Sequence, residues 1–500
     1  MQIVALVLAS AVAVAGCAAS GGSGASLDAG ASSDGADAKP GIIERAKDWV
    51  AGQQSDRPLI TGLHPGKYEP AATAIGVERD LARRRGELFG LVQDHSLHRY
   101  VNRLRDDLIK VSGVTDVPGN TYLVATPELQ ARATADGNIF LSIAWLDNLE
   151  NEDQLAGLIA HELAHVLLRH HASDAGGRYH KRGVAAYQLA LKIRSQAESS
   201  RLSAADVERS EQADLSIKLM DLGIMPVWGR RQEQQADLLA NDLLVRAGYN
   251  MNGLTEMLAK LQAFEEATTK SEEQVNEEIQ SLAATDFKAA LKLAGATLMR
   301  TISADHPPTG ERIENLPGYQ DVHYSEAELP TPKVKPYKEA TKAASRIIAN
   351  YRKTYDARRL MLEKDFRKAY PMAKEGVGPP TRTAVYPNWV LFLAANSMGR
   401  QDEAFVALER AYRNPADPVN AVYREYSEAL GERRRYGDAL TVAERAYKVF
   451  DESPAWLPLR IKWLVRLHRK KEAESLAAEC GLQHSEFKEP CLAALTPTAR

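Results

Sequence analysis

Ala160-His161-Glu162-Leu163-Ala164-His165 is the stretch of this 500-residue chain that says most about its fold and chemistry. Residues four positions apart share one face of a helix, so the imidazoles of His161 and His165 point at one spot. The carboxylate of Glu162 is close enough to reach a water molecule bound there. Two neutral imidazoles beside a carboxylate are what a zinc site with a general base for peptide-bond hydrolysis requires. Taken alone, the stretch also fits a solvated helix with two unrelated histidines.

The residues before the motif favour a helix. Asn151 can cap it, and Gln154 follows three residues later, as in a capping box. Its apolar faces come from Leu155, Leu158, Ile159 and Val166. We therefore expect a helix that begins just after Asn151 and carries both histidines.

A second helix is expected to supply the third ligand, because catalytic zinc usually takes three protein ligands and keeps the fourth position for water. Residues 230–237 read Arg-Arg-Gln-Glu-Gln-Gln-Ala-Asp, and a leucine-rich run follows until Gly248. Glu233 is the predicted third ligand. Asp237, one turn later, is placed to orient a ligand histidine through its free ring nitrogen, and the small Ala236 would allow close approach of the two helices. The alternative is a surface helix with ordinary exposed carboxylates.

HExxH followed by ExxAD on a later helix resembles the gluzincin family of membrane-associated peptidases, which includes the CAAX prenyl endopeptidases, the heat-shock protease HtpX and the periplasmic protease BepA. The resemblance covers roughly residues 75 to 320. Beyond the two motifs it rests on Asn138–Leu141, Arg169-His170, Arg230, Ala247–Asn250 and His306–Arg312. It implies a mostly helical α+β fold, in which a zincin peptidase domain with a small sheet binds Zn²⁺.

Two features depart from the family pattern. The family commonly has Asn-Ala-Phe on the edge strand along which a substrate would add its backbone, where this chain reads Gln130-Ala131-Arg132. Arg132 is expected to change side-chain preference more than catalysis. In addition, 67 residues separate His165 from Glu233, a long interval for the family. We interpret the polar, helix-prone segment 174–216 as a mobile cover over the cleft, although an ordinary helical hairpin fits it equally well.

The resemblance also implies roles for His306 and Arg312. His306 would lie near the metal and either stabilise the oxyanion or occupy the open zinc position in a resting state. Arg312 would hold that loop or face the developing charge. A loop histidine before two prolines is the alternative for His306. The nine histidines outside these motifs have no ligand spacing, and most are expected at the surface.

The N-terminus predicts export and lipid attachment. Residues 1–15 are mostly small and apolar and too few to span a bilayer, and Val14-Ala15-Gly16-Cys17 looks like a bacterial lipobox that ends a signal peptide, residues 1–17. Acylated Cys17 would anchor the protein to the outer membrane on its periplasmic side. A plain secretory signal with an incidental cysteine is the alternative. Residues 18–55 are expected to form a flexible tether.

The remaining sequence predicts a metallopeptidase domain over 56–325, a linker over 326–345 and helical repeats over 346–500. Residues 403–412 recur as 438–447, an offset of 35, and related dipeptides stand at 368–369 and 472–473. This period resembles tetratricopeptide repeats, which bind peptides on a concave surface. An array of generic helical hairpins is the alternative. In an oxidising periplasm, Cys480 and Cys491 are expected to form a disulfide.

These features together predict a zinc metalloendopeptidase, lipid-anchored in the periplasm, that cleaves misfolded or misassembled envelope proteins. Glu162 would take the proton of the attacking water and pass it to the leaving amine. The repeats would recruit substrates or partners such as the outer-membrane assembly machinery. The alternative is a periplasmic chaperone or scaffold lipoprotein with a latent or structural zinc site. A net charge of −3 with only short basic runs excludes nucleic acid as an expected partner.

Overall fold

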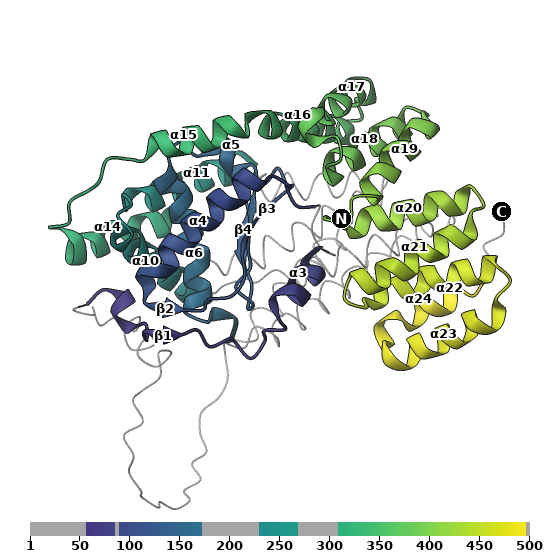
Figure 1. Ribbon diagram of the computed structural model, residues 1–500, viewed down its shortest axis with the longest axis horizontal. Coiled ribbons are helices and arrows are strands. Elements are labelled where there is room, and N and C mark those ends of the chain that lie inside the picture. Colours follow the sequence, from purple (N-terminus) through teal and green to yellow (C-terminus); the bar gives the residue numbers. More distant parts are fainter. Residues whose placement is uncertain (1–56, 86–89, 173–229, 269–308, 497–500) are drawn as a thin grey trace, which may run out of the picture. The chain divides into compact units, whose positions relative to one another are not determined.

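The computed structural model describes residues 57–85, 90–172, 230–268 and 309–496 (Figure 1). The predicted signal peptide with Cys17, the tether, the segment 174–216 and His306 lie outside these residues. Within them, no helix combines the length and apolar character that a membrane crossing requires. The described part of the chain is mostly helical, contains two small sheets and finishes in an all-helical region, so the predicted fold class is confirmed.

A three-stranded sheet forms one side of the first domain. Its order is β3 (Thr121–Val124), β5 (Ile139–Ser142) and β4 (Ala131–Ala133), with β3 parallel and β4 antiparallel to β5. All four residues of β5 are buried, which explains its unbroken run of Ile-Phe-Leu-Ser. Because β4 pairs only with β5 among the described strands, it is an edge strand of this sheet. A shorter parallel pair joins β1 (Gly66–Lys67) to β2 (Val114–Thr115).

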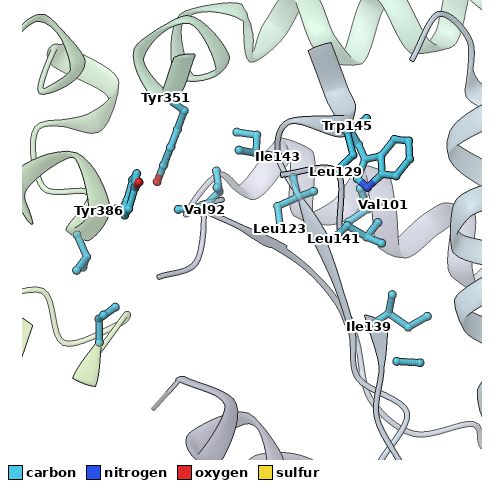
Figure 2. Close-up of a cluster of buried hydrophobic side chains, with 14 of the residues drawn as sticks. Val92, Val101, Leu123, Leu129, Ile139, Leu141, Ile143, Trp145, Tyr351 and Tyr386 are labelled. Atoms are coloured by element: carbon cyan, nitrogen blue, oxygen red, sulfur yellow. The ribbon is translucent and has the colours of Figure 1, made fainter. Parts of the chain in front are cut away.

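Helices pack against the sheet and against one another. They are α4 (His95–Ser112), α6 (Glu152–Leu167), α10 (Arg230–Arg246), α11 (Asn252–Thr268) and α14 (Thr309–Tyr324), with the shorter α3 (Val77–Arg85) and α5 (Trp145–Asn148). Figure 2 shows Leu123 and Leu141, from adjacent strands, near Val101 of α4 in the core. Helix α6 lies at the centre, because α4, α10, α11 and β4 all pack against it.

Helix α6 begins as expected. The Gln154 N–H donates to the Asn151 side chain at 2.9 Å. The capping box is displaced by one residue, since Gln154 Oε1 accepts from the Glu150 N–H at 2.8 Å and not from Asn151. All 16 residues of α6 are buried, so it is apolar on most sides apart from the motif and its first turn.

The segment predicted as a linker contains helix α15 (Val334–Ala343), with Pro336 in its first turn, where a missing N–H is tolerated. The Tyr337 hydroxyl donates to the Leu146 carbonyl at 2.8 Å. The Lys333 N–H donates to Asp153 at 2.6 Å, and the Glu152 N–H donates to the Lys333 carbonyl at 3.1 Å. This segment is thus bound to the first turn of α6.

Consecutive helices pack in pairs through the C-terminal region. They are α16 (Ser345–Leu362), α17 (Phe366–Gly376), α18 (Val385–Ser397), α19 (Gln401–Tyr412), α20 (Asn420–Glu432), α21 (Tyr436–Val449), α22 (Leu457–Arg466), α23 (Lys470–Gln483) and α24 (Lys488–Ala493). The alanines at the predicted repeat position are all buried: Ala369, Ala404, Ala439 and Ala473. Cys480 and Cys491 form a disulfide that ties α23 to α24.

Candidate metal centre

Three side chains from two helices meet at one point. His161 and His165 come from α6, and Glu233 comes from α10. One ligand atom of each lies within 4.8 Å of the other two, and all three residues are buried. The two Nε2 atoms are 3.2 Å apart, and Glu233 oxygens lie 3.4 Å from His161 Nε2 and 3.8 Å from His165 Nε2.

These separations fit a zinc ion. Ligand atoms about 2.1 Å from a tetrahedral metal stand about 3.4 Å from one another. Two imidazole nitrogens with one carboxylate are a donor set that zinc accepts, and three protein ligands leave a fourth position for water. Among the described residues this is the single cluster with ligand atoms so close together.

The outer side of His161 faces Asp237 and Arg312. Asp237 Oδ1 lies 2.9 Å from His161 Nδ1, so it can accept the proton that leaves Nε2 free for a metal. Arg312 donates through Nε and through one terminal nitrogen to the two Asp237 oxygens, at 2.8 and 2.7 Å. Its other terminal nitrogen lies 3.3 Å from Glu233. Arg312 therefore holds Asp237 in place and also touches the carboxylate of the predicted third ligand.

The charges around this group shift its pKa values in the protein without a metal. Burial works against ionised Asp237, but Arg312 and His161 outweigh it and lower the pKa of that carboxyl. Burial and Arg312 lower the pKa of His161. Its hydrogen bonds with Asp237 and Glu233 act in the opposite direction and prevail, so the pKa is raised to about 9. The site thus stabilises a positive charge at this point.

Glu162 lies beside the predicted ligands and beside edge strand β4. Its carboxylate accepts the backbone N–H of Ala133, and burial raises its pKa to about 7. Ala133 pairs with Ile139 and Arg132 with Phe140, so β4 runs next to the base with its other edge unpaired among the described strands. Helix α6 thereby places a carboxylate between the metal position and a strand edge.

Sequence reasoning missed His170, and the expectation of a surface position is wrong for this residue. His170 is 5% exposed, and its Nδ1 lies 2.9 Å from His165 Nδ1. Arg169 ends the helix with a φ of 53°, and this left-handed conformation turns the chain so that the next residue folds back against His165. His170 Nε2 lies 3.3 Å from Gln235 Oε1 of α10. The one signal in the sequence was the Arg-His pair shared with the family.

An HExxH helix, a glutamate from a later helix and the carboxyl group of Glu162 beside an edge strand define a metallopeptidase domain of the zincin type. Comparison of the sequence with known protein families and proteins narrows this class. Residues 94–320 match the model of Peptidase family M48. The resemblance predicted from the two motifs is confirmed.

Three of the similar proteins are relatives that match part of the chain. Mitochondrial metalloendopeptidase OMA1 of Schizosaccharomyces pombe is 27% identical over 171 residues, 34% of this chain and 46% of the relative. The beta-barrel assembly-enhancing protease of Yersinia pestis is 27% identical over 176 residues, 34% of each chain. The protein of that name from Escherichia coli K12 is 35% identical over 80 residues, 16% of each chain. The chain thus matches less than half the length of each relative.

Proposed function

We propose that this protein is a zinc-dependent endopeptidase that acts on misfolded or misassembled proteins of the bacterial envelope. The observation that carries the proposal is the position of Glu162, next to the three ligand side chains and to the edge of β4. A structural zinc site has no use for such a carboxylate, because its four positions are closed by protein ligands. A scaffold with an idle site would leave Glu162 without a role.

When bound, zinc supplies a Lewis acid for the scissile carbonyl and lowers the pKa of water toward neutrality. The chain's own residues do the rest. His161, His165 and Glu233 hold the ion, while Asp237 and Arg312 keep His161 in the tautomer that presents Nε2. Glu162 takes the proton of the attacking water and returns it to the leaving amine.

An extended substrate would add its backbone to the outer edge of β4, which pairs with no other described strand and lies beside Glu162. Arg132 is at the centre of this strand and would affect which side chains are accepted next to the scissile bond. His306 completes the proposal as a residue near the metal, carried over from the family's His-Pro motif, although it lies outside the described residues.

The substrate class and location rest on other observations. Two relatives are named beta-barrel assembly-enhancing proteases, which favours envelope proteins as substrates and the outer-membrane assembly machinery as a partner. Stacked helix pairs of the kind seen in α16–α23 bind extended peptides in other proteins and would recruit clients here. The lipobox at Cys17 supports an anchor in the outer membrane, facing the periplasm.

The decisive experiment compares the protein lacking residues 1–17 with its Glu162→Gln variant. Bound zinc is quantified in both, and cleavage of an unfolded protein is followed by electrophoresis. We expect one zinc per chain in both proteins and a loss of cleavage of about 10²- to 10⁴-fold in the variant, the usual contribution of a general base. A chelator should abolish wild-type cleavage and added zinc should restore it. Equal cleavage by the two proteins would refute the role of Glu162, and zinc without cleavage in either would favour a scaffold.

The anchor needs a separate test in cells. Cys17→Ser should abolish incorporation of a labelled fatty acid and release the protein from the outer-membrane fraction, whereas the Glu162→Gln variant should keep both properties. Labelling of the Cys17→Ser variant at the wild-type level would exclude this cysteine as the attachment site.

A further inference from the structure

The two histidines of the motif are supported in different ways. His161 faces the buried carboxylate of Asp237. His165 instead faces a second histidine, with 2.9 Å between its Nδ1 and the Nδ1 of His170. Behind His170, the side-chain oxygen of Gln235 lies 3.3 Å from Nε2. A chain of three side chains therefore runs from the metal position toward helix α10.

If His165 binds a metal, the ring protons of His165 and His170 must be arranged in one particular way. His165 Nε2 faces the other ligands, so it must carry no proton, and the ring proton then resides on Nδ1. That N–H needs an acceptor, and His170 Nδ1, 2.9 Å from His165 Nδ1, can serve as one if it presents its lone pair. His170 then carries its own proton on Nε2, where the Gln235 oxygen accepts it. The opposite order would place a proton on His165 Nε2 and block the metal.

Helix α10 fixes His170 from two sides. Gln235 contacts the ring, and Gln232 Nε2 donates to the His170 carbonyl at 3.3 Å. The positive φ of Arg169 turns His170 toward α10 from the end of α6. The same turn of α10 carries Glu233, so the predicted third ligand and the support of His165 move together.

We propose that His170 is a positioning residue for the zinc ligand His165, and that Gln235 selects the His170 tautomer that can accept the His165 proton. This inference rests on the proposed zinc site and adds to it the support for the second histidine ligand. Removing such a support usually weakens metal binding by about 10- to 100-fold.

The test uses two substitutions at one position. In His170→Asn, the side-chain oxygen can take the place of Nδ1 and still accept the His165 proton, whereas His170→Leu fills the space without an acceptor. Zinc affinity is measured by competition with a chromophoric chelator, and Co²⁺ absorption spectra report the geometry of the site. We expect about 10- to 100-fold weaker zinc binding and an altered Co²⁺ spectrum for His170→Leu, and values within about threefold of wild type for His170→Asn.

Thermal unfolding of the metal-free proteins separates positioning from packing, because a positioning role predicts a difference between Asn and Leu only in the presence of metal. Equal losses of zinc affinity in both variants, or none in His170→Leu, would overturn the inference while leaving the proposed function intact. Failure of the wild-type protein to bind zinc would overturn both. If His170→Leu does not fold, Gln235→Leu provides the same comparison. It should weaken zinc binding, and unchanged affinity in that variant would refute the selection of the tautomer.

Discussion

Asp153 joins the first turn of α6 to the start of α11 and to the segment predicted as a linker through a single buried carboxylate, so its replacement should have a large local effect. The residue is 1% exposed and lies in the first turn of α6. One oxygen accepts the Asn250 N–H at 2.8 Å, at the start of α11, and the other accepts the Lys333 N–H at 2.6 Å, in the segment before α15. Asp153→Ala removes both acceptors and leaves one buried and one partly buried N–H group without these partners.

The size of the effect follows from these contacts. A hydrogen bond to a charged group contributes about 1.5–3 kcal/mol, so two of them amount to about 3–6 kcal/mol. A carboxylate in the first helical turn adds about 0.3–1 kcal/mol through the helix dipole. We expect a loss of at least about 3 kcal/mol in the local stability of residues 250–254 and 330–334, which corresponds to roughly 150-fold faster amide exchange. Asp153→Asn retains one acceptor and should lose less.

Hydrogen exchange measured by mass spectrometry is the suitable assay, because a chain of this size does not unfold in one step and a global free energy is poorly defined. Asp438→Ala is the matched control, since that carboxylate is 57% exposed and pairs only with Arg435 at the surface, and it should change exchange by less than the equivalent of about 1 kcal/mol. If exchange in the two segments stays within tenfold of wild type in Asp153→Ala, the reasoning is refuted: the linker segment is then held by other contacts.

Three further predictions concern packing, pH and the C-terminus. A Cβ added to Gly253 would lie 2.5 Å from the Asp153 carbonyl carbon, so Gly253→Ala should push α11 away from α6 and lower the melting temperature, at a cost of about 1–3 kcal/mol; unchanged melting would contradict the close approach. Burial raises the pKa of Asp242 from 3.8 to about 6, so its folded state binds a proton more tightly than the unfolded state, and its contribution to stability should rise by up to about 3 kcal/mol as the pH falls from 7 to below 4. That rise should appear in the local difference in amide exchange between wild type and Asp242→Asn, measured at each pH around Ile60, whose N–H donates to Asp242 at 2.8 Å, and a difference that stays constant with pH would exclude it. Reduction of Cys480–Cys491 opens a loop closed over a sequence separation of 11, so it should destabilise α23–α24 by about 3 kcal/mol, and proteolysis should cut there only with reductant present.

The sequence was sufficient for the parts of the site that obey helical periodicity. His161 and His165 repeat at four residues on α6, and Glu233 and Asp237 repeat at four on α10, so their grouping follows from the residue types and the spacing alone. The cap at Asn151 follows from local chemistry in the same way. In each case, the relevant contact is determined within one helical turn.

The contacts that sequence reasoning missed depend on the path of the backbone between helices and strands. His170 follows Arg169, whose backbone lies in the left-handed region. An arginine does not predict a positive φ, which glycine or asparagine adopts far more readily. The role of Asp153 depends on Lys333, 180 residues away, and no periodic pattern relates the two. The proline-rich residues 330–336 do not announce helix α15, which begins at Val334 and has Pro336 in its first turn, where proline is well tolerated.

Helix α10 shows why the missed contacts matter for the chemistry. Glu233 and Asp237 lie on one face, and Gln235 points about 200° away from Glu233, so periodicity assigns it to the opposite side. The turn at Arg169 brings His170 to that opposite side, and α10 thereby reaches His165 as well as His161. One helix supplies the predicted third ligand and the supports of both histidines. A displacement of α10 against α6 would therefore disturb all three ligands together, and metal affinity should depend more steeply on the packing of these two helices than on any single supporting residue.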